Sequence, residues 1–446
     1  MPTAIFTIAR SGLSATRSSL ELTAQNVANA ANPDYSRRTL TQGELVMTGT
    51  IGPNGAASLG GVRPGVIERA ESALVQRQAR DASSALSAAE AEFFALREAE
   101  SAIETSGLFQ GLVDFEAALT RLEGNPLEPA LRLSALESAR QMASTFRVAN
   151  GTLANTRGLV QGETSAEVLT VNELTSELAA VNRDLVGTRE GTAGYAALLD
   201  ARDKALRGLA EQFAIVPTIN ANGTADVALA GAPPVTLVTG ANAETVSVAF
   251  AADGTASFAV GATAVVPSGG AMAGRAAALT RIAVLQSDLD ALAVSTVTIA
   301  NTAQASGSAA DGTPGQPLFA GTGAGSITVV LGSANGLATA PAGAPAGSRN
   351  TANLAALIGA LGADTGPTAG ADALLLALSS EVSAVQTRRD GLAVVASSAE
   401  AELLRETGVD LDNEAANLVR LQQAFEANSR VIQVAADIFD TLLGLR

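Results

Sequence analysis

The stretch DLDNEAANLVRLQQAFEANSRVIQVAADIFDTLLGL, residues 410–445, carries the most regular pattern in the chain. Its large apolar residues return every seven positions, and others lie three positions further on. Leu411, Leu418, Phe425, Ile432 and Phe439 form the first set, and Leu421 and Leu442 belong to the second. Such a repeat predicts a long helix with one apolar seam. We expect Asp410 or Asp412 to cap this helix, with Glu414 in its first turn.

A second stripe lies at the other end of the chain, over about residues 3–31. Phe6, Leu13, Leu20 and Val27 are spaced by seven, and the smaller Ala9, Thr16, Thr23 and Ala30 lie three positions further on. The run Asn32-Pro33-Asp34-Tyr35 should end this helix, because proline disfavours helical geometry in the residue before it. Periodicity alone leaves open whether the two stripes pack within one chain or between chains. Their place at the chain ends, where ordinary domains fray, favours packing between copies.

The sequence between the stripes is mainly helical, apart from residues 37–65, which are expected to form strands or extended loop, and one β-rich part. Helices are predicted over 66–106, 112–122, 129–156, 163–185 and 193–212, and again over 271–305, 350–361 and 371–406. Short strands with turns at Asn222-Gly223 and Asp253-Gly254 fill residues 215–266, and a strand at 326–331 is expected to return to them.

The expected fold is therefore mainly α with an inserted β-rich domain. Its terminal helices form a coiled-coil-like base, followed by a helical middle block and a small outer β domain. The terminal assembly helices take residues 1–40 and 408–446. The helical rod-like domain takes residues 41–212, 270–310 and 350–407, and the β-rich domain takes 213–269 and 318–349.

The composition disfavours several classes of function. None of the 446 residues is cysteine, histidine or tryptophan, which removes the commonest nucleophile–base pairs and most zinc, copper and haem ligands. The formal net charge of −16, without a basic cluster, argues against nucleic acids and anionic membranes as partners. The first ten residues do not resemble a secretory signal, and no apolar run approaches the ~20 residues of a membrane span.

Two patterns could carry chemistry, and each has a simpler interpretation. Asp410, Asp412 and Glu414 alternate as in a calcium loop, but the glycine and glutamate that complete such a loop are missing. The glycine-rich run 321–326 lacks the lysine and the helix of a phosphate-binding loop. We therefore expect no catalytic residue, no metal and no cofactor, with a hydrolase that uses carboxylates alone as the alternative.

The two ends of the chain resemble the axial proteins of the bacterial flagellum, the family of rod, hook and hook-associated subunits. Residues 20–38, LELTAQNVANAANPDYSRR, are similar to the N-terminal motif of that family, in which an N-[IV]-A-N helix end precedes a T-P-G-Y turn. The residues at the motif positions are Asn29, Asn32, Pro33, Asp34 and Tyr35. Two of them differ from the family motif, because Asn32 stands in place of threonine and Asp34 in place of glycine. Residues 408–443, from GVDLDNEAANL to FDTLL, resemble its C-terminal ending.

Three inner stretches favour a hook-associated member of the family, placed at the junction between hook and filament. They are LLDARD at 198–203, residues 268–275 and residues 311–319. The resemblance implies a self-assembling structural subunit, with hook protein, a second junction protein and flagellin as partners. It also implies type III export to the flagellum outside the cell, after a cytoplasmic chaperone has held the C-terminal helix. The implied assembly seam is Phe6, Leu13, Leu20, Val27, Leu411, Leu418, Leu421, Phe425, Ile432, Phe439 and Leu442.

Other structural readings stay open: another axial subunit, which is a hook or rod subunit or a second junction protein, and a secreted filament-type protein. An intact helical block that follows the N-terminal turn argues against rod and hook subunits, which turn to β structure early. An adhesive filament protein would usually show sequence repeats or surface aromatics, whereas aromatic residues make up only 3% of this sequence.

Overall fold

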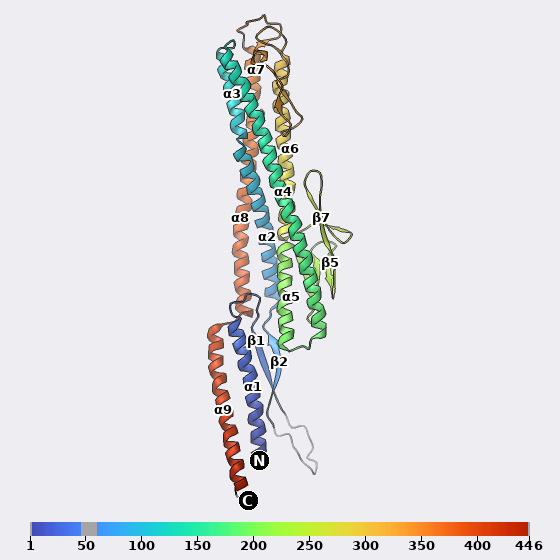
Figure 1. Cartoon of the computed structure of the whole chain (residues 1–446), viewed down its shortest axis with the longest axis vertical. Helices are drawn as coiled ribbons and strands as arrows, with labels where there is room; N and C mark the ends of the chain where they lie inside the picture. The colour runs from blue at the N-terminus through green and yellow to red at the C-terminus, as the bar shows by residue number, and fades with distance from the viewer. Residues whose placement is uncertain (1, 46–59, 445–446) are drawn as a thin grey trace. The chain divides into compact units, whose positions relative to one another are not determined.

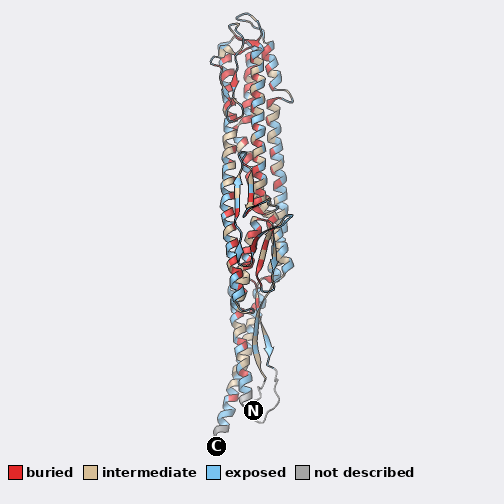
Figure 2. Ribbon diagram, turned by 90° about the vertical axis from the view of Figure 1, so that its right-hand side faces the viewer, coloured by how far each residue is buried: buried red, intermediate tan, exposed pale blue. Residues whose placement is uncertain are grey.

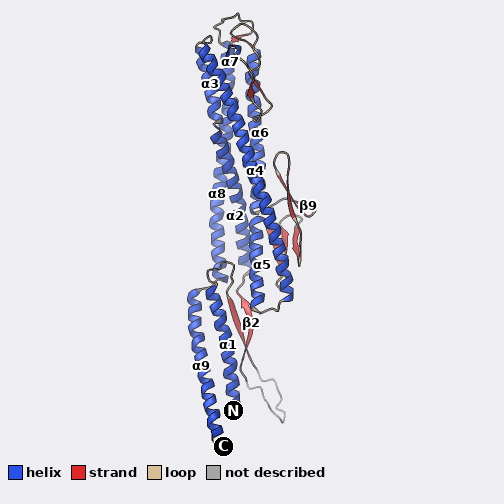
Figure 3. Ribbon diagram, in the orientation of Figure 1, coloured by secondary structure: helices blue, strands red, loops and turns tan. Residues whose placement is uncertain are grey.

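The computed structural model describes residues 2–45 and 60–444, with side chains described over 5–45 and 60–441. The chain is mainly helical with short strands inserted, as the sequence predicts (Figure 1, Figure 3). It divides into two compact units, each built from separate stretches of sequence. Unit 1 comprises Met1–Ser84, Thr170–Val246 and Ala393–Arg446, and unit 2 comprises Ala85–Leu169 and Ser247–Leu392.

Unit 1 contains both terminal helices and a four-stranded sheet. Its elements include α1 (Pro2–Ala28), β1 (Arg38–Glu44), β2 (Val62–Arg69), α5 (Ala193–Gln212), β3 (Ile215–Ile219), β4 (Ala225–Leu229), β5 (Val235–Thr239), β6 (Asn242–Ala243) and α9 (Leu411–Gly444). Strands β3 to β6 are hydrogen-bonded in sequence order. Alternate residues of β4 are buried, so the sheet turns one face toward a core. The predicted Asn222-Gly223 turn between β3 and β4 is confirmed, and Gly223 has the positive φ of 79° that it requires.

Unit 2 is a bundle of helices with one contiguous apolar core. It contains α3 (Leu108–Gly124), α6 (Gly270–Ala305) and α7 (Ala352–Leu361), and shares with unit 1 the helices α2 (Ala73–Ser106), α4 (Pro129–Gly187) and α8 (Pro367–Thr407). Figure 2 shows buried residues repeated along these helices. Phe115 and Phe146 are among the few large anchors, and alanines such as Ala99 and Ala139 are buried between them. The core therefore combines small residues with a few aromatic side chains.

The small residues let two helices of unit 2 approach closely. A Cβ added to Gly274 of α6 would lie 2.0 Å from the carbonyl oxygen of Ala88 on α2. No side chain can occupy that space unless the backbones move apart. Glycine at position 274 thus sets the distance between α6 and α2.

We expect Gly274→Ala to lower the free energy of unfolding of unit 2 by about 1–3 kcal/mol, the usual cost of overpacking a core. Gly158→Ala is the matched control, because Gly158 also lies within a helix and a Cβ there meets no atom within 4 Å. This control should gain about 0.5–1 kcal/mol from the better helix propensity of alanine. Urea unfolding of both variants measures the two effects, and an equal change in both would contradict the close approach.

The structure corrects two details of the predicted helices. Residues 66–69 belong to β2, and the helix starts only at Ala73. The predicted break between 156 and 163 is wrong, because α4 runs unbroken from Pro129 to Gly187. Gly158 and Gly162 lie within the predicted break, and both occupy open positions of a helix that its buried face stabilises.

The strand predicted over 326–331 does not return to the earlier strands. Strand β12 (Thr328–Val329) pairs with β11 (Phe319–Ala320) and joins neither of the sheets over residues 215–265. Its neighbours Leu318, Phe319 and Ile327 are buried in the helical core of unit 2. The side chain of Asn301 on α6 accepts the N–H groups of Leu318 and Phe319 at 2.8 and 3.0 Å. These contacts fix the segment to the helices of unit 2. The domain boundaries given above stay predictions.

The remaining short strands lie in unit 2. Strand β7 (Val246–Phe250) begins at its boundary and forms a three-stranded sheet with β8 (Ala256–Val260) and β9 (Thr263–Val265). Strand β10 (Gly307–Ser308) pairs with β13 (Ala340–Pro341). The predicted turn at Asp253-Gly254 lies between β7 and β8, and Gly254 has a φ of 91°.

Two stretches, Gly270–Ala305 and Pro367–Thr441, are long and apolar enough to cross a membrane by length and composition. Core helices of globular proteins pass the same test. Within α6, Leu279, Ile282 and Leu285 are fully buried in the apolar core of unit 2, so packing within that unit accounts for its apolar character.

Candidate assembly interface

The two terminal helices of unit 1 lie side by side, as Figure 1 shows. Small residues are buried at their contact: Ala9, Thr16 and Thr23 of α1 and Ala435 of α9. Ala9, Thr16 and Thr23 are small residues that the heptad pattern places between the large apolar positions, and Ala435 lies seven positions before Leu442. The two helices thus meet within one chain, and small members of their stripes are among the buried residues.

The larger residues of the predicted seam are only partly covered. Leu13, Leu20, Leu418, Leu421, Phe425 and Ile432 are half-buried, whereas Phe6, Val27, Leu411 and Phe439 are exposed. Phe6 and Phe439 keep 43% and 48% of their surface accessible. The side chain of Leu442 lies outside the described residues. The pair α1–α9 therefore leaves large apolar side chains exposed to solvent. The core of a folded protein usually buries such side chains.

Further apolar residues on the same helices are exposed and were missed by the heptad reasoning. They are Ile5 and Ile8 on α1 and Val419, Val431, Val434 and Ile438 on α9. Their signal was present in the sequence, because valines and isoleucines at several heptad positions imply more than one apolar face. A helix with two apolar faces can contact one neighbour within its chain and another outside it.

Polar contacts fix the register of α1 against α9. The Nδ2 of Asn417 donates a hydrogen bond to the Oγ1 of Thr23 at 3.1 Å. Asn428, a polar residue seven positions after Leu421, packs over Gly12, where an added Cβ would lie 3.0 Å from its Oδ1. Polar residues at such positions fix helix register at some expense in stability.

The head of α9 is capped as predicted and tied to the N-terminal turn. Asp410 accepts the N–H groups of Asp412 and Asn413 at 2.9 and 3.2 Å, which confirms Asp410 as the capping residue. Glu414, in the first turn, is buried and accepts a hydrogen bond from Nε of Arg37 at 2.7 Å. The N–H of Arg37 also donates to the carbonyl oxygen of Thr407 at 2.8 Å, so the segment after α1 holds the start of α9.

The family turn motif folds as a compact unit after α1. Asn32 accepts the N–H of Asp34 at 3.1 Å in an Asx turn around the exposed Pro33. Asn29 donates its side-chain amide to the carbonyl oxygen of Gln25 at 2.8 Å, at the end of the helix. Asp34 in turn accepts a hydrogen bond from Arg207 of α5 at 2.9 Å. The aspartate that replaces the family's glycine thus links the turn to a second helix.

Tyr35 anchors the motif through a buried asparagine. Its hydroxyl donates to Oδ1 of Asn26 at 2.7 Å, and the guanidinium of Arg38 lies 4.7 Å from the centre of its ring. Asn26 also pairs with the backbone of Arg38, donating to its carbonyl oxygen at 2.9 Å and accepting its N–H at 3.1 Å. Burial raises the pKa of Tyr35, so its hydroxyl stays a proton donor at neutral pH.

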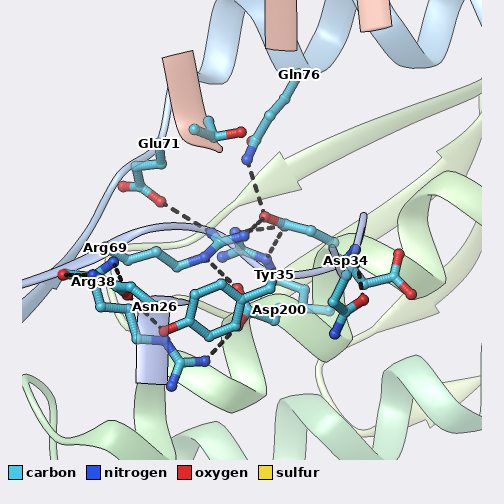
Figure 4. A network of polar contacts seen from close by, with 12 residues as sticks. Asn26, Asp34, Tyr35, Arg38, Arg69, Glu71, Gln76 and Asp200 are labelled. Atoms are coloured by element: carbon cyan, nitrogen blue, oxygen red, sulfur yellow. Dashed lines mark hydrogen bonds and ion pairs between the residues drawn. The ribbon is translucent and has the colours of Figure 1, made fainter. Parts of the chain in front are cut away.

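A buried network of ion pairs surrounds this motif, and the sequence did not reveal it (Figure 4). Asp200 of α5 pairs with Arg38 at 2.5 Å and with Arg69 at 2.7 Å. Asp203 pairs with Arg69 at 2.6 Å and with Arg202 at 2.7 Å, and accepts a hydrogen bond from Gln76 at 3.0 Å. The only signal was the LLDARD stretch, which matched the family without a role. The network joins the N-terminal turn, β2, α2 and α5 within unit 1.

The network should make unit 1 sensitive to acid. Burial acts to raise the pKa of Asp203, but the charges of Arg69 and Arg202 and their hydrogen bonds outweigh it, so this pKa lies below its ordinary value. Asp203 therefore stabilises the fold above the unfolded pKa of about 3.9, and this contribution is lost as pH falls through the lower folded value. The parent chain should have a higher free energy of unfolding than Asp203→Asn at pH 7, and this difference should shrink below about pH 4. Urea unfolding of both chains from pH 7 to pH 2 measures the difference. A difference that stays constant over this range would contradict a lowered pKa of Asp203.

The described residues hold no group of three or more acidic side chains placed to bind a metal ion. Helices α1 and α9 expose apolar side chains. Capping, turn and ion-pair contacts hold the end of α1 and the start of α9 in place. Such an arrangement suits association with other chains.

Family models match both the helical middle and the C-terminal end of the chain. The model described as "Flagellar hook-associated protein FlgK helical domain" matches residues 98–319. The model described as "Flagellar basal body rod FlgEFG protein C-terminal" matches residues 402–445, which include α9.

Two relatives are named flagellar hook-associated protein 1. The protein from Bacillus subtilis (strain 168) is 26% identical over 222 residues, covering 48% of this chain and 44% of that protein. The protein from Escherichia coli (strain K12) is 23% identical over 227 residues, covering 50% and 41%. The matches thus span less than half the length of either relative.

Among solved structures, the flagellar hook junction protein FlgK from Burkholderia pseudomallei matches with a TM-score of 0.49 and 24% identity. The match covers 55% of this chain and 46% of that one. Motifs at both ends, two family models over separate stretches and two relatives of one name agree. The chain belongs to the family of flagellar hook-associated proteins that includes hook-associated protein 1.

Proposed function

We propose that this chain is a structural subunit of the bacterial flagellum that forms the junction between hook and filament. The observation that carries the proposal is the uncovered apolar surface of α1 and α9, which includes Phe6 and Phe439. These helices bear the two motifs of the axial family. The chain acts mechanically: its terminal helices pack against neighbouring copies, and the rest of the subunit follows them into the assembly.

The partners follow from this position. One face of the assembly meets the hook protein, and the other meets a second junction protein and then flagellin. The subunit leaves the cell through the type III channel, and before export a cytoplasmic chaperone covers α9, whose exposed apolar side chains would otherwise associate. The acidic net charge of −16 opposes nonspecific contact with nucleic acid or an anionic membrane. We assign no catalytic activity to the chain.

Deletion of the gene tests the proposal. Cells without the subunit should carry bare hooks in electron micrographs and release flagellin into the medium. Normal filaments would overturn the junction role and favour a secreted filament-type protein. Loss of hooks as well would place the chain in the rod or the hook.

A further inference from the structure

Residues 306–349 connect α6 to α7 within unit 2 and contain little regular structure. The segment holds the two-residue strands β10 to β13 and the short 3-10 helix η1 (Ala334–Gly336). Polar side chains of both flanking helices hold it just after η1. Oε1 of Gln304 on α6 accepts the N–H of Ala338 at 2.6 Å, and Nδ2 of Asn353 on α7 donates to the carbonyl oxygen of Ala338 at 2.7 Å.

A third helix, α4, contributes an arginine to the same place. Arg132 lies in the first turn of α4 and is among the largest fully buried side chains, with 1% of its surface accessible. Its Nε donates to the carbonyl oxygen of Pro126, between α3 and α4, at 2.6 Å. Its Nη1 and Nη2 donate to the carbonyl oxygen of Leu337 and to Oγ1 of Thr339, both at 2.9 Å. The carbonyl oxygens of two η1 residues lie at 3.3 and 3.4 Å from Nη1.

The charge of Arg132 is buried among neutral oxygen atoms. Among the described residues, no carboxylate forms an ion pair with Arg132, and burial lowers its pKa. Arginine nevertheless stays protonated at neutral pH. The carbonyl oxygens of Pro126 and Leu337 have no other hydrogen-bond donor in the part of the chain that the structure describes. Both oxygens therefore depend on Arg132, because a buried acceptor without a donor is destabilising.

We propose that Arg132 is a built-in cation that fastens the segment 306–349 to the helices of unit 2, so that the order of residues 334–340 depends on one guanidinium group. A guanidinium carries five N–H donors in a fixed planar fork, so it bonds Pro126 and Leu337 at the same time. Its removal should release residues 334–340 while the helices stay folded, because the apolar core holds the helices together.

Hydrogen exchange of the full chain, measured by mass spectrometry, tests the proposal. In Arg132→Ala the amides of residues 334–340 should exchange about tenfold faster than in the parent, and those of the core residues 278–293 of α6 should not change. Arg147→Ala is the matched control, because Arg147 is an exposed arginine of α4 that donates to the carbonyl oxygen of Ile327 in the same segment at 2.9 Å. Equal acceleration in both variants, or faster exchange throughout residues 278–293, would overturn the local role of Arg132.

Chemical rescue separates the charge of Arg132 from its packing. Arg132→Ala leaves a cavity beside oxygen atoms that have lost their donor, and engineered cavities can bind small molecules of matching shape. Guanidinium chloride on the order of 20 mM, far below denaturing concentrations, should restore slow exchange at residues 334–340. Urea, a neutral planar molecule of similar size, should not restore it at the same concentration. Rescue by urea as well, or no rescue by guanidinium, would overturn the requirement for a cation.

Arg132→Lys keeps the charge and tests the proposal even if the alanine variant does not fold. An ammonium group is a single point on a flexible stem, so it cannot bond Pro126 and Leu337 together as the fork does. Exchange at residues 334–340 should rise about threefold, and added guanidinium should not reduce it because the lysine side chain fills the cavity. Exchange equal to that of the parent would show that a point charge suffices and would overturn the role of the guanidinium.

Discussion

Phe439→Asp should abolish incorporation of the subunit into the flagellum without unfolding it. Phe439 keeps 48% of its surface accessible in the single chain, so a charge there removes little internal packing. In an assembly the same position would place a carboxylate in an apolar contact. Burial of a phenylalanine contributes about 1.5–3 kcal/mol, and burial of an unpaired charge costs more. Each contact between neighbouring copies would lose this free energy.

The measurement combines electron microscopy of cells that carry the variant with circular dichroism of the purified chain. Gln433→Asp is the matched control, because Gln433 is a polar and exposed residue of the same helix and the substitution adds the same charge. The control should support normal filaments, and both variants should keep the helical signal of the parent. Normal filaments with Phe439→Asp would show that this part of the predicted seam faces solvent in the assembly.

Asp203→Asn should lower the free energy of unfolding of unit 1 by about 3–5 kcal/mol, the usual effect of removing one partner from a buried ion pair. Asp203 is the shared acceptor of Arg69, Arg202 and Gln76. Without the charge of Asp203, the guanidinium groups of Arg69 and Arg202 stay buried but lose one ion-pair partner each. The turn motif should lose its support at the same time, because Arg69 also orients Asp200, the partner of Arg38.

Urea unfolding monitored by circular dichroism measures this loss. Asp81→Asn is the control, because Asp81 belongs to an exposed ion pair with Arg77 in the same unit. Exposed pairs of this kind contribute about 0–1 kcal/mol. Similar losses in the two variants would mean that the buried network does not hold unit 1 together.

The sequence predicted the features that depend on short-range pattern. The terminal helices follow from seven-residue stripes, the cap at Asp410 from a preference of helix ends, and the Asn222-Gly223 turn from a hairpin signal. Each of these depends on residues within one or two helical turns. The pattern also predicted one apolar seam along the terminal helices, and it did not include other apolar residues that are exposed there, such as Ile5 and Val434.

The features that the sequence did not predict depend on distant residues. Arg38 and Asp200 are 162 positions apart, and Arg37 and Glu414 are 377 positions apart. Nothing local in the sequence marks these charges as buried. The strand at 328–329 was assigned to the wrong partners for the same reason, since its place depends on Asn301 and on the helical core of unit 2.

The position of the subunit on the flagellum tests the proposed junction role. Ala262 is an exposed residue between β8 and β9, and an Ala262→Cys variant can carry a maleimide gold particle because the chain has no other thiol. We expect gold in one narrow band at the distal end of the hook, where the filament begins. Gold along the whole filament, along the whole hook or at the cell body would contradict a junction subunit.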